Sequence, residues 1–532
     1  MRKHINLYIL LAILALGSFI RLFMLSKSPP SLNWDEAALG YNAYSLLKTG
    51  KDEYGFKFPL VLRSFDDYKP ALYSYLTILP IAVLGLTEFS VRFISALSGI
   101  SIILAVYLLA KKFFNEKVAI LSALFVAFEP WAVHFSRIAF EANLALALTL
   151  WAIYFALKAK NNLHYLYLSI ILLFLSAFAY HANKVLLMPL LITFFIYNRK
   201  SLGLSQLYKF FVLVIPLLFA LLLTLKGGAG VARLGSTSIL KAVSLQPATN
   251  LYTFMNGVYN LILNLFGRYL AYFSPINLFV RGTNEPNQAI HNFGLFYNFE
   301  FFLFLIGVWK TFQSKFKPRI LFFIILLVPL PAIITWNWFS PVRTLLIFAL
   351  YAILIGLGAN EAISYFAKKS KFLLVMVLAL SGLLYSNKVG NLATTLFMYI
   401  PYAEKGNWQY GFRETMSAIH PIADNHDQII FETGQAQPHI FVLFYSQYDP
   451  NQYHKNIGCP KCVEMPRKNF DFGKYHFRNI YWPEDKDLAN TLFVGSTYSL
   501  PEQDIQFTPN ALIIEDVTDF RGDFISRLVE TK

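Results

Sequence analysis

Two acid-rich clusters early in the chain carry the side chains best suited to chemistry. Asp35 and Glu36 stand side by side about ten residues after a long apolar run, and Asp67, Tyr68 and Lys69 follow further on. A carboxylate can take a proton from a hydroxyl group, and a cation can hold a phosphate. Together these side chains favour the transfer of a group from a phosphate-linked donor to an alcohol.

Further ionisable groups recur at later turns of the chain. Arg137 and Glu141 lie four residues apart in HFSRIAFEANLAL, so they share a helix face and form either a structural pair or part of a site. His181 and Lys184 follow in AYHANK, and Arg343 follows in WFSPVR. The membrane topology argued below puts all of them on the same side as the acids, which makes the basic ones candidates to bind a phosphate.

Asp35 and Lys69 each have a simpler explanation as well. The stretch 37–50 has apolar residues at helical spacing and ends in Gly50, which predicts an interfacial amphipathic helix with the acid pair at its N-terminus. Asp35 either caps this helix or acts in catalysis, and the two roles are compatible. Lys69 either holds a lipid phosphate or extends its amine to water beside the apolar run 71–86.

The composition is that of an integral membrane protein. Of 532 residues, 56% are hydrophobic and only 14% are charged, whereas soluble domains carry about 25% charged residues. The basic excess, 34 Lys and Arg against 13 Asp and Glu, falls before residue 401, and the remaining chain has 12 against 18. Basic loops on the cytoplasmic side of a membrane account for this excess, so we expect no nucleic acid partner.

Eleven apolar segments are predicted to cross the membrane as helices. The first follows Arg2 and Lys3, is too long for a signal peptide, and is expected to start in the cytoplasm. Every cytoplasmic loop is then basic, whereas a span at 71–86 would invert the pattern, so we predict an interfacial or re-entrant helix there. The eleven segments are 5–25, 91–110, 118–134, 143–157, 165–180, 185–197, 210–225, 296–309, 320–335, 342–358 and 372–386.

Three sizeable segments are then predicted to lie outside the cytoplasm. They are a first loop at 26–90, a second loop at 226–295 and a soluble tail at 401–532, so the transmembrane domain covers 1–400. The tail holds four runs with strand character between polar stretches, namely QIIFET, IFVLFY, TLFVGS and ALIIED. This alternation predicts a small α/β domain.

At these residues the chain resembles the phospholipid-carrier-dependent glycosyltransferases of GT-C fold (glycosyltransferase family 39 type). This family includes protein O-mannosyltransferases and the aminoarabinose transferase of lipid A. The resemblance covers roughly residues 1–400, is most specific in the first loop, and implies a polytopic α-helical membrane protein of GT-C fold. The matching stretches are NWDEAALGYNAYSLLKTGKDEYG, SFDDYKPALYSYL, EFSVRFISALSG, SRIAFEANLAL, AYHANKVLLMPLL and RYLAYFSPINLFVRG.

The resemblance also implies a reaction. A sugar carried on a polyprenyl or dolichyl phosphate passes to an acceptor hydroxyl with inversion at the anomeric carbon, on the outer face of the membrane. Asp35 matches the first-loop carboxylate of the family, which acts as a base or orients the acceptor, and Glu36 stands beside it. Lys69 matches the lysine of a Lys-Pro pair. Arg137 resembles a second phosphate contact, because a phosphate leaving group needs cations more than a proton donor. Lys184 and Arg343 are further candidates for donor binding, and candidates for supporting roles are Asp67, Tyr68, Glu141 and His181.

The chain departs from its relatives at several polar positions. Tyr68 stands where some relatives have Glu before the Lys-Pro pair, Glu141 where relatives often have Asp, and Gly282-Thr283 where they often have Gly-Asp. A divalent metal is compatible with the family. Because the Glu on which relatives could build a metal site is replaced here by Tyr68, no metal is assigned. The two cysteines, Cys459 and Cys462, form a single CxxC, which is either a local disulfide or a pair of thiols.

A transporter or lipid flippase is the main alternative to a glycosyltransferase. Transporters carry polar groups near the bilayer midplane and often have repeated halves, whereas this chain has no evident repeat and gathers its ionisable groups at one face. A third possibility, a receptor or anchor whose tail does the work, leaves the acid-rich first loop unexplained. The enzyme is the favoured hypothesis, and the acceptor stays open between a protein, a lipid and a glycan.

Overall fold

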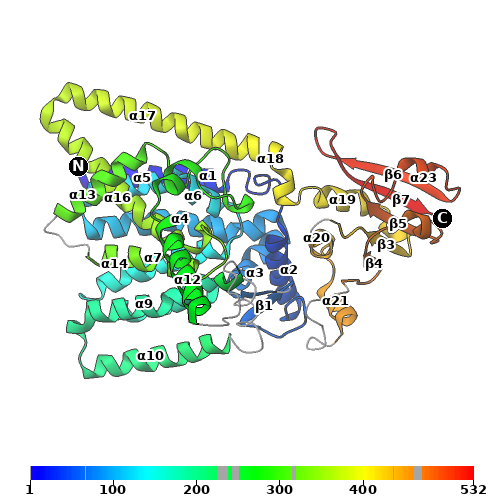
Figure 1. Ribbon diagram of the computed structural model, residues 1–532, viewed down its shortest axis with the longest axis horizontal. Helices are drawn as coiled ribbons and strands as arrows, with labels where there is room; N and C mark the ends of the chain where they lie inside the picture. Colours follow the sequence, from blue (N-terminus) through cyan, green and yellow to red (C-terminus); the bar gives the residue numbers. More distant parts are fainter. Residues whose placement is uncertain are drawn as a thin grey trace. The chain divides into compact units, whose positions relative to one another are not determined.

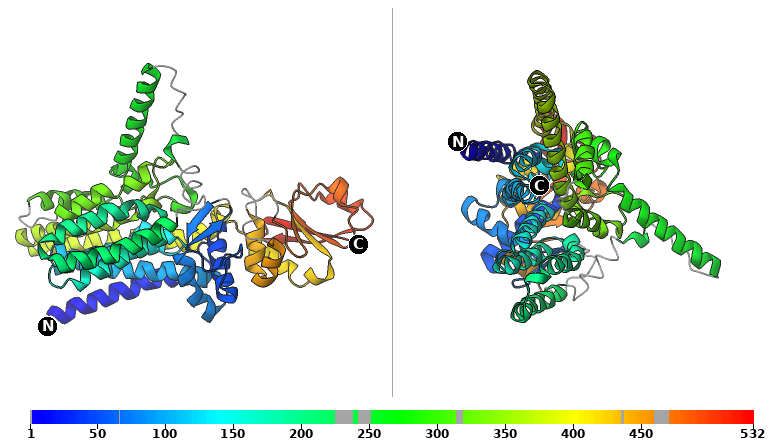
Figure 2. Two further views of the ribbon diagram at one scale, coloured as in Figure 1. Left: turned by 90° about the horizontal axis from the view of Figure 1, so that it is seen from below. Right: turned by 90° about the vertical axis from the view of Figure 1, so that its left-hand side faces the viewer.

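The chain folds into two compact units (Figures 1 and 2). The first predicted outside loop and the predicted tail fall largely into the same unit. The computed structural model describes residues 2–65, 67–224, 238–241, 251–313, 319–434, 437–458 and 470–532. The membrane unit comprises Met1–Leu25, Lys69–Tyr73 and Arg92–Ile400, and the loop–tail unit comprises Ser26–Tyr68, Ser74–Val91 and Pro401–Lys532.

The membrane unit is a helical bundle in which α16 (Leu345–Lys369) is central. This helix is buried without interruption from Leu345 to Asn360, as expected of a helix that is apolar on every side. It packs against α5 (Glu116–Phe128), α7 (Glu141–Lys158), α13 (Glu300–Gln313) and α17 (Lys371–Thr394). Further helices are α1 (Arg2–Leu22), α4 (Glu88–Phe113), α6 (Pro130–Ser136), α8 (His164–Ala179), α9 (His181–Asn198), α10 (Leu204–Leu223), α12 (Leu251–Ala271), α14 (Arg319–Leu327) and α15 (Leu330–Ile333).

Two glycines allow α13 and α16 to approach closely. A Cβ atom at Gly358 would collide with the carbonyl oxygen of Leu303, and a Cβ atom at Gly307 would collide with that of Leu354. Small residues at such contacts let the backbones of membrane helices touch. The packing of these two helices therefore depends on the absence of a side chain at both positions.

Gly358→Ala should destabilise the membrane unit, because the added methyl group forces α13 and α16 apart. Overpacking of this kind costs roughly 1–3 kcal/mol, so we expect the melting temperature in detergent to fall by several degrees. Gly382→Ala in α17 is the matched control, since a Cβ atom there meets nothing within 4 Å. Alanine also favours helix over glycine by about 1 kcal/mol. Equal melting temperatures for the two variants would contradict the packing argument.

The described residues contain five helices long and apolar enough to cross a membrane, or six if α5 and α6, which meet at a 57° bend, form one span. All eleven predicted segments contain helix, but the predicted number of eleven spans is not confirmed. One reason is that α8 has only 16 residues, and another is that the segment 320–335 is split between α14 and α15. The five helices are His4–Leu22, Glu88–Phe113, Leu204–Leu223, Leu345–Lys369 and Lys371–Ala403.

The apolar run 71–86 forms a short helix, α3 (Leu72–Leu84), of 13 residues. At a rise of 1.5 Å per residue such a helix is about 20 Å long, which is less than the roughly 30 Å of a hydrocarbon core. This length agrees with the prediction that the run does not span the membrane. Its interfacial or re-entrant position stays a prediction.

The predicted second loop contains a long helix that the sequence analysis missed. Helix α12 has 21 residues and exposes large apolar side chains, among them Leu251, Phe254 and Phe266. The rest of this loop is described only in part, because 225–237 and 242–250 lie outside the described residues. Asp66, Cys459 and Cys462 also lie outside them.

The loop–tail unit joins part of the first loop to the tail. Helix α2 (Trp34–Thr49) packs against α20 (Pro438–Tyr445) and α21 (Pro450–Ile457) of the tail. The helix predicted at 37–50 is thus confirmed, and it ends at Gly50, whose φ of 68° suits glycine. Its predicted amphipathic character is wrong, because α2 is buried without interruption from Glu36 to Ala43.

The tail is an α/β domain with a five-stranded sheet in the order β4-β3-β5-β7-β6. Strand β3 lies parallel to both β4 and β5, with Ile430 opposite His476 on one side and Phe493 on the other. Strand β7 is antiparallel to β5 and β6. The elements are α19 (Phe412–Ile419), β3 (Gln428–Phe431), β4 (Tyr475–Phe477), α22 (Trp482–Asp485), β5 (Thr491–Gly495), α23 (Glu502–Gln506), β6 (Ala511–Thr518) and β7 (Phe524–Thr531).

One of the four predicted strands in the tail is wrong. The run IFVLFY belongs to helix α20, which begins at Pro438 and is buried from there to Phe444. A short, fully buried apolar run has the same pattern as a strand or as a helix, and only the proline at the first helical position pointed to a helix. The strands predicted at QIIFET, TLFVGS and ALIIED are confirmed as β3, β5 and β6.

Candidate functional site

The N-terminus of α2 holds the predicted catalytic pair, and a capping box uses one of the two acids. Asn33 is the N-cap: its side-chain oxygen accepts from the Glu36 backbone N–H at 2.9 Å, and Glu36 Oε2 accepts from the Asn33 backbone N–H at 3.1 Å. This is a capping box, which satisfies two helix-terminal N–H groups. The alternative that Asp35 caps the helix is therefore wrong. Asp35 lies half-buried in the first turn, and Glu36 is buried.

Hydrogen bonds fix α2 within the loop–tail unit. The Asn42 amide donates to Glu53 Oε2 at 2.8 Å, and the Glu53 backbone N–H donates to the Asn42 side-chain oxygen at 3.0 Å. The Tyr41 hydroxyl donates to the backbone oxygen of Tyr448 at 3.0 Å. These bonds join the helix both to the following loop and to the tail. Asp35 is therefore carried by a rigid element, as a site residue must be.

An ionic cluster around the buried Glu88 joins the first loop to the tail, and the sequence analysis did not find it. Glu88 accepts from Arg413 at 3.0 Å and from the Tyr445 hydroxyl at 2.8 Å. Burial alone would lower the pKa of the Arg413 guanidinium, but the charges of Glu88 and Glu414 outweigh this effect and raise it. These partners stand more than 300 residues apart, so no local pattern could have indicated the contact.

The loop after α2 contains a buried carboxylate with an altered acidity. Asp52 Oδ1 accepts from the backbone N–H groups of Tyr54 at 3.0 Å and Phe56 at 2.9 Å. Its Oδ2 is buried and has no hydrogen-bond partner among the described residues. Burial raises the pKa of Asp52 to about 6, although these N–H groups and the charge of Arg63 act in the opposite direction.

Asp52→Asn should change stability in a pH-dependent way. The folded chain holds the proton of Asp52 up to about pH 6, whereas the unfolded chain releases it near pH 4. The contribution of Asp52 is therefore most favourable below pH 4 and is lost as the pH rises through 6. The asparagine keeps an acceptor for the two N–H groups and does not titrate. We expect its melting temperature to exceed that of wild type by a few degrees at pH 7.5, with the gap closing at pH 4.5; a constant gap would contradict the assignment.

The second predicted cluster forms a short strand. Strand β2 (Asp67–Pro70) pairs with β1 (Val61–Ser64), and Asp67, Tyr68 and Lys69 are all half-buried. Asp67 Oδ1 accepts from the Tyr68 backbone N–H at 2.8 Å. The boundary between the two compact units falls inside β2, so Tyr68 belongs to the loop–tail unit and Lys69 to the membrane unit.

Arg137 is engaged with the end of α1. Its Nη1 donates to the backbone oxygen of Ile20 at 2.6 Å, and its Nη2 donates to that of Met24 at 3.2 Å. The guanidinium also lies over the Phe397 ring, 4.8 Å from the ring centre, and the residue is buried. These contacts anchor a helix terminus, which is a structural role. A contact between Arg137 and phosphate stays a prediction.

A small pocket lies at the first turns of α7 and α16, and the predicted residue Arg343 lines it. Glu141 is the first residue of α7, and Arg343 ends the turn before α16. The pocket is lined by Arg343, Tyr180 and the first turns of both helices. Tyr180 interacts electrostatically with both Arg343 and Glu141. The structure therefore places Arg343 beside a tyrosine that the sequence analysis missed, and the charge of Glu141 acts on the same tyrosine.

The two predicted residues of α9 lie in its first turn. His181 is the first residue of the helix, and both His181 and Lys184 are half-buried. The Lys184 amine donates to the Thr224 hydroxyl at 3.0 Å. An amine has three donors, so this bond leaves capacity for a further acceptor.

Two carboxylates buried in the membrane unit were also missed. Glu129 follows the last residue of α5 and accepts from the Trp131 indole at 2.7 Å, and Glu300 accepts from the Tyr297 backbone N–H at 3.0 Å. Each has a second oxygen that is buried and has no hydrogen-bond partner among the described residues. An acid followed by Pro130 inside an apolar run was the available signal, because ionisable residues at membrane depth are rarely incidental.

The described part of the chain contains no group of three or more His, Cys, Asp or Glu side chains arranged to hold a metal ion. A divalent metal accordingly stays unassigned, as it was from the sequence.

Comparisons with known proteins bear on the fold and the family. Residues 68–224 match the family described as dolichyl-phosphate-mannose-protein mannosyltransferase. A search of curated protein sequences finds no match.

Solved structures resemble the chain over almost its whole length. ArnT from Cupriavidus metallidurans in the apo state has a TM-score of 0.55 at 12% identity, and the match covers 99% of this chain and 98% of that one. The same protein bound to undecaprenyl phosphate has a TM-score of 0.54 at 13% identity, with 98% and 97% covered. At this identity the likeness shows a shared fold.

Proposed function

We propose that this chain, which belongs to the GT-C glycosyltransferases, moves a sugar from a polyprenyl phosphate to an acceptor hydroxyl on the outer face of the membrane. Its membership rests on the family match at residues 68–224 together with the fold shared with ArnT. Both observations confirm the resemblance predicted from the sequence. The donor, the side of the membrane on which transfer occurs and the acceptor chemistry are the proposed part.

The donor is inferred from the relatives. The matching family is named for a dolichyl phosphate sugar, and one ArnT structure holds undecaprenyl phosphate. Both are long isoprenoid phosphates, so we propose a donor of the same class here. Lys69 is the principal candidate to hold its phosphate, with Lys184 and Arg343 as further candidates, because a cation stabilises the charge of a phosphate leaving group.

The chemistry assigns a base and a leaving group. The acceptor oxygen forms a bond to the anomeric carbon of the sugar, while the bond between that carbon and the phosphate oxygen breaks with inversion. The phosphate leaves with the bonding electrons, and the acceptor proton passes to the Asp35 carboxylate. Protein, lipid and glycan acceptors all supply the hydroxyl that this step needs.

The capping box is the observation that carries this assignment. It gives Glu36 a structural role at the N-terminus of α2 and shows that the cap is made without Asp35. We therefore assign the role of general base to Asp35, the acid of the pair that the capping box does not use.

The test is turnover of a defined donor by the purified full chain. Polyprenyl phosphates that carry different single sugars are incubated with the protein, and free polyprenyl phosphate is measured with and without added acceptor alcohols. We expect release from at least one donor, accompanied by transfer or by hydrolysis. If every donor stays intact but moves across the membrane of vesicles that contain the protein, the transporter hypothesis is correct instead.

A further inference from the structure

The order of the strands in the tail sheet reverses between β3 and β5. The chain leaves β3 to form β4 on one side of it, and then returns to form β5 on the other side, with all three strands parallel. Open α/β sheets bind ligands outside the carboxyl ends of their strands at such a switch point. The tail therefore has a topologically defined place for a ligand.

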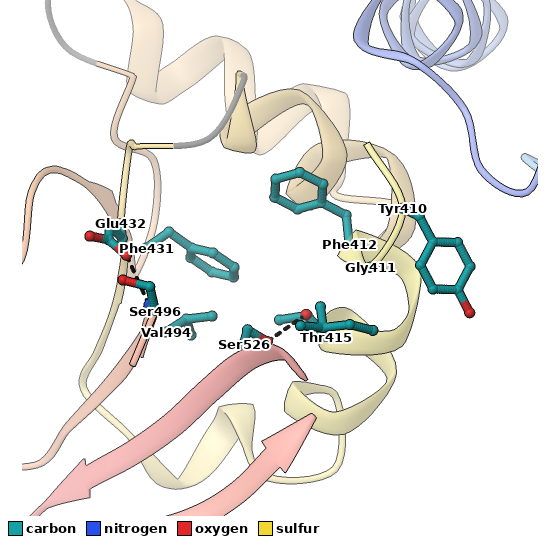
Figure 3. Close-up of a pocket in the computed structure, with 11 residues that line it drawn as sticks. Tyr410, Gly411, Phe412, Thr415, Phe431, Glu432, Val494, Ser496 and Ser526 are labelled. Carbon is teal, nitrogen blue, oxygen red and sulfur yellow. Dashed lines mark hydrogen bonds between the residues drawn. The ribbon is translucent and has the colours of Figure 1, made fainter. Parts of the chain in front are cut away.

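A pocket occupies this place (Figure 3). It is lined by the residues that end β3 and β5, including Phe431, Glu432 and Ser496, and on the opposite side by Phe412 of α19 and Ser526 of β7. It encloses about 470 Å³, part of which is open to solvent. The pocket is open on one side, so a ligand can enter it from solvent.

The polar groups of the pocket are held in place. Glu432 Oε2 accepts from the Ser496 backbone N–H at 2.8 Å and from the Ser499 hydroxyl at 2.9 Å. A carboxylate can accept about four hydrogen bonds, and these two leave capacity for donors from a ligand. The Thr415 and Ser526 hydroxyls bond to each other at 2.8 Å on another wall (Figure 3).

Two aromatic rings supply the apolar walls. Phe412 stacks on Phe441 with ring centres 4.3 Å apart, and Phe431 stacks on Phe477 with centres 5.7 Å apart. Both rings are therefore fixed before a ligand arrives. Rings of this kind present an apolar surface to a ligand.

The charge of the pocket excludes one ligand class. No Lys, Arg or His side chain is among its described lining residues, and Glu432 contributes a carboxylate. A phosphate or carboxylate ligand would meet repulsion there and no compensating cation. A neutral molecule with several hydroxyl donors and apolar C–H faces fits both the carboxylate and the phenyl rings.

We infer that this pocket binds a saccharide, with one pyranose ring inside it. The hydroxyl groups donate to Glu432, and the C–H face of the ring lies against Phe412 or Phe431. The saccharide comes either from an acceptor glycan or from the sugar group of the donor. Binding here is separate from the transfer reaction and does not depend on whether Asp35 is the catalytic base.

The test measures binding without turnover. The full chain is purified in a detergent that has no sugar headgroup, and saturation-transfer NMR is recorded with free glucose, mannose, galactose, arabinose and N-acetylglucosamine. We expect at least one of them to bind. Glu432→Gln and Phe412→Ala should each weaken that binding at least tenfold, measured at a temperature at which each variant is folded.

Matched controls separate the pocket from the surface of the same domain. Glu515 is exposed on β6 and Phe507 is 88% exposed, so Glu515→Gln and Phe507→Ala should bind like wild type. Ser526→Tyr, which fills the pocket, should abolish binding. Absence of binding by all five sugars, or binding that survives in the three pocket variants, would overturn the inference.

A competition experiment identifies the source of the saccharide. A defined polyprenyl phosphate sugar is added to the complex with the free sugar, in wild type and in Asp35→Asn. Displacement in both proteins points to the donor sugar, and retention of the free sugar in both points to an acceptor glycan.

Discussion

Asp35→Asn should lower the rate of sugar transfer by about three orders of magnitude while leaving donor binding nearly unchanged. A positioned general base contributes roughly 10²- to 10⁴-fold to a rate, and asparagine keeps the size of aspartate but cannot take the acceptor proton. The fold should survive, because the capping box of α2 uses Asn33 and Glu36. The measurement is release of polyprenyl phosphate under saturating donor, with the melting temperature recorded for the same preparation.

Glu36→Gln is the sharpest control for this result. Glutamine can replace glutamate in a capping box, so the helix terminus should stay intact and activity should stay within a fewfold of wild type. Glu36→Ala should instead lower the melting temperature, since it removes a cap worth roughly 1 kcal/mol. Loss of activity in Glu36→Gln with full activity in Asp35→Asn would exchange the roles of the two acids.

The contrast between these acids shows how far sequence could lead at the site. The pattern needed for the cap was present, because Asn33 is followed three residues later by Glu36 and then by an apolar stretch. Sequence reasoning gave the possible cap to Asp35, because aspartate is preferred at the N-cap position as strongly as asparagine is. Only the bond between Glu36 and the Asn33 N–H distinguishes the two acids.

The tail illustrates a different limit. Strands β3, β5 and β6 were predictable because polar stretches separate their apolar runs. Strand β4 has only three residues and β7 carries charged residues such as Arg527, so neither has a strong pattern of its own. Helix α20 looks like a strand because burial on every side removes the helical period.

Long-range contacts could not be predicted at all. Arg137 was predicted to contact phosphate from its resemblance to the family. Its Nη1 and Nη2 groups, however, bond to the backbone oxygens of Ile20 in α1 and of Met24 just after it, more than 100 residues earlier. The same holds for Glu88 and Arg413, whose pairing joins the first loop to the tail.

Lys69→Ala is the second variant for which we expect a large effect. If Lys69 holds the donor phosphate, its loss should lower kcat/KM for the donor by about 10²- to 10³-fold, the range found when one group that stabilises a developing charge is removed. Lys69→Arg should recover part of the activity, because arginine also carries a charge that binds phosphate. Lys57→Ala is the control, since Lys57 is exposed in the same loop.

The form of the loss discriminates between the two roles considered for this lysine. A lysine that only extends its amine to water contributes to neither donor binding nor leaving-group stabilisation, so Lys69→Ala would then match Lys57→Ala in both kcat and KM. Loss of a phosphate ligand that acts in the ground state and in the transition state alike raises KM alone. Loss of one that acts on the developing charge lowers kcat. Because the phosphate gains charge only as the glycosidic bond breaks, we expect most of the effect in kcat. An increase confined to KM would still place Lys69 at the donor but would assign leaving-group stabilisation to other cations, with Arg343 and Lys184 as the next residues to change.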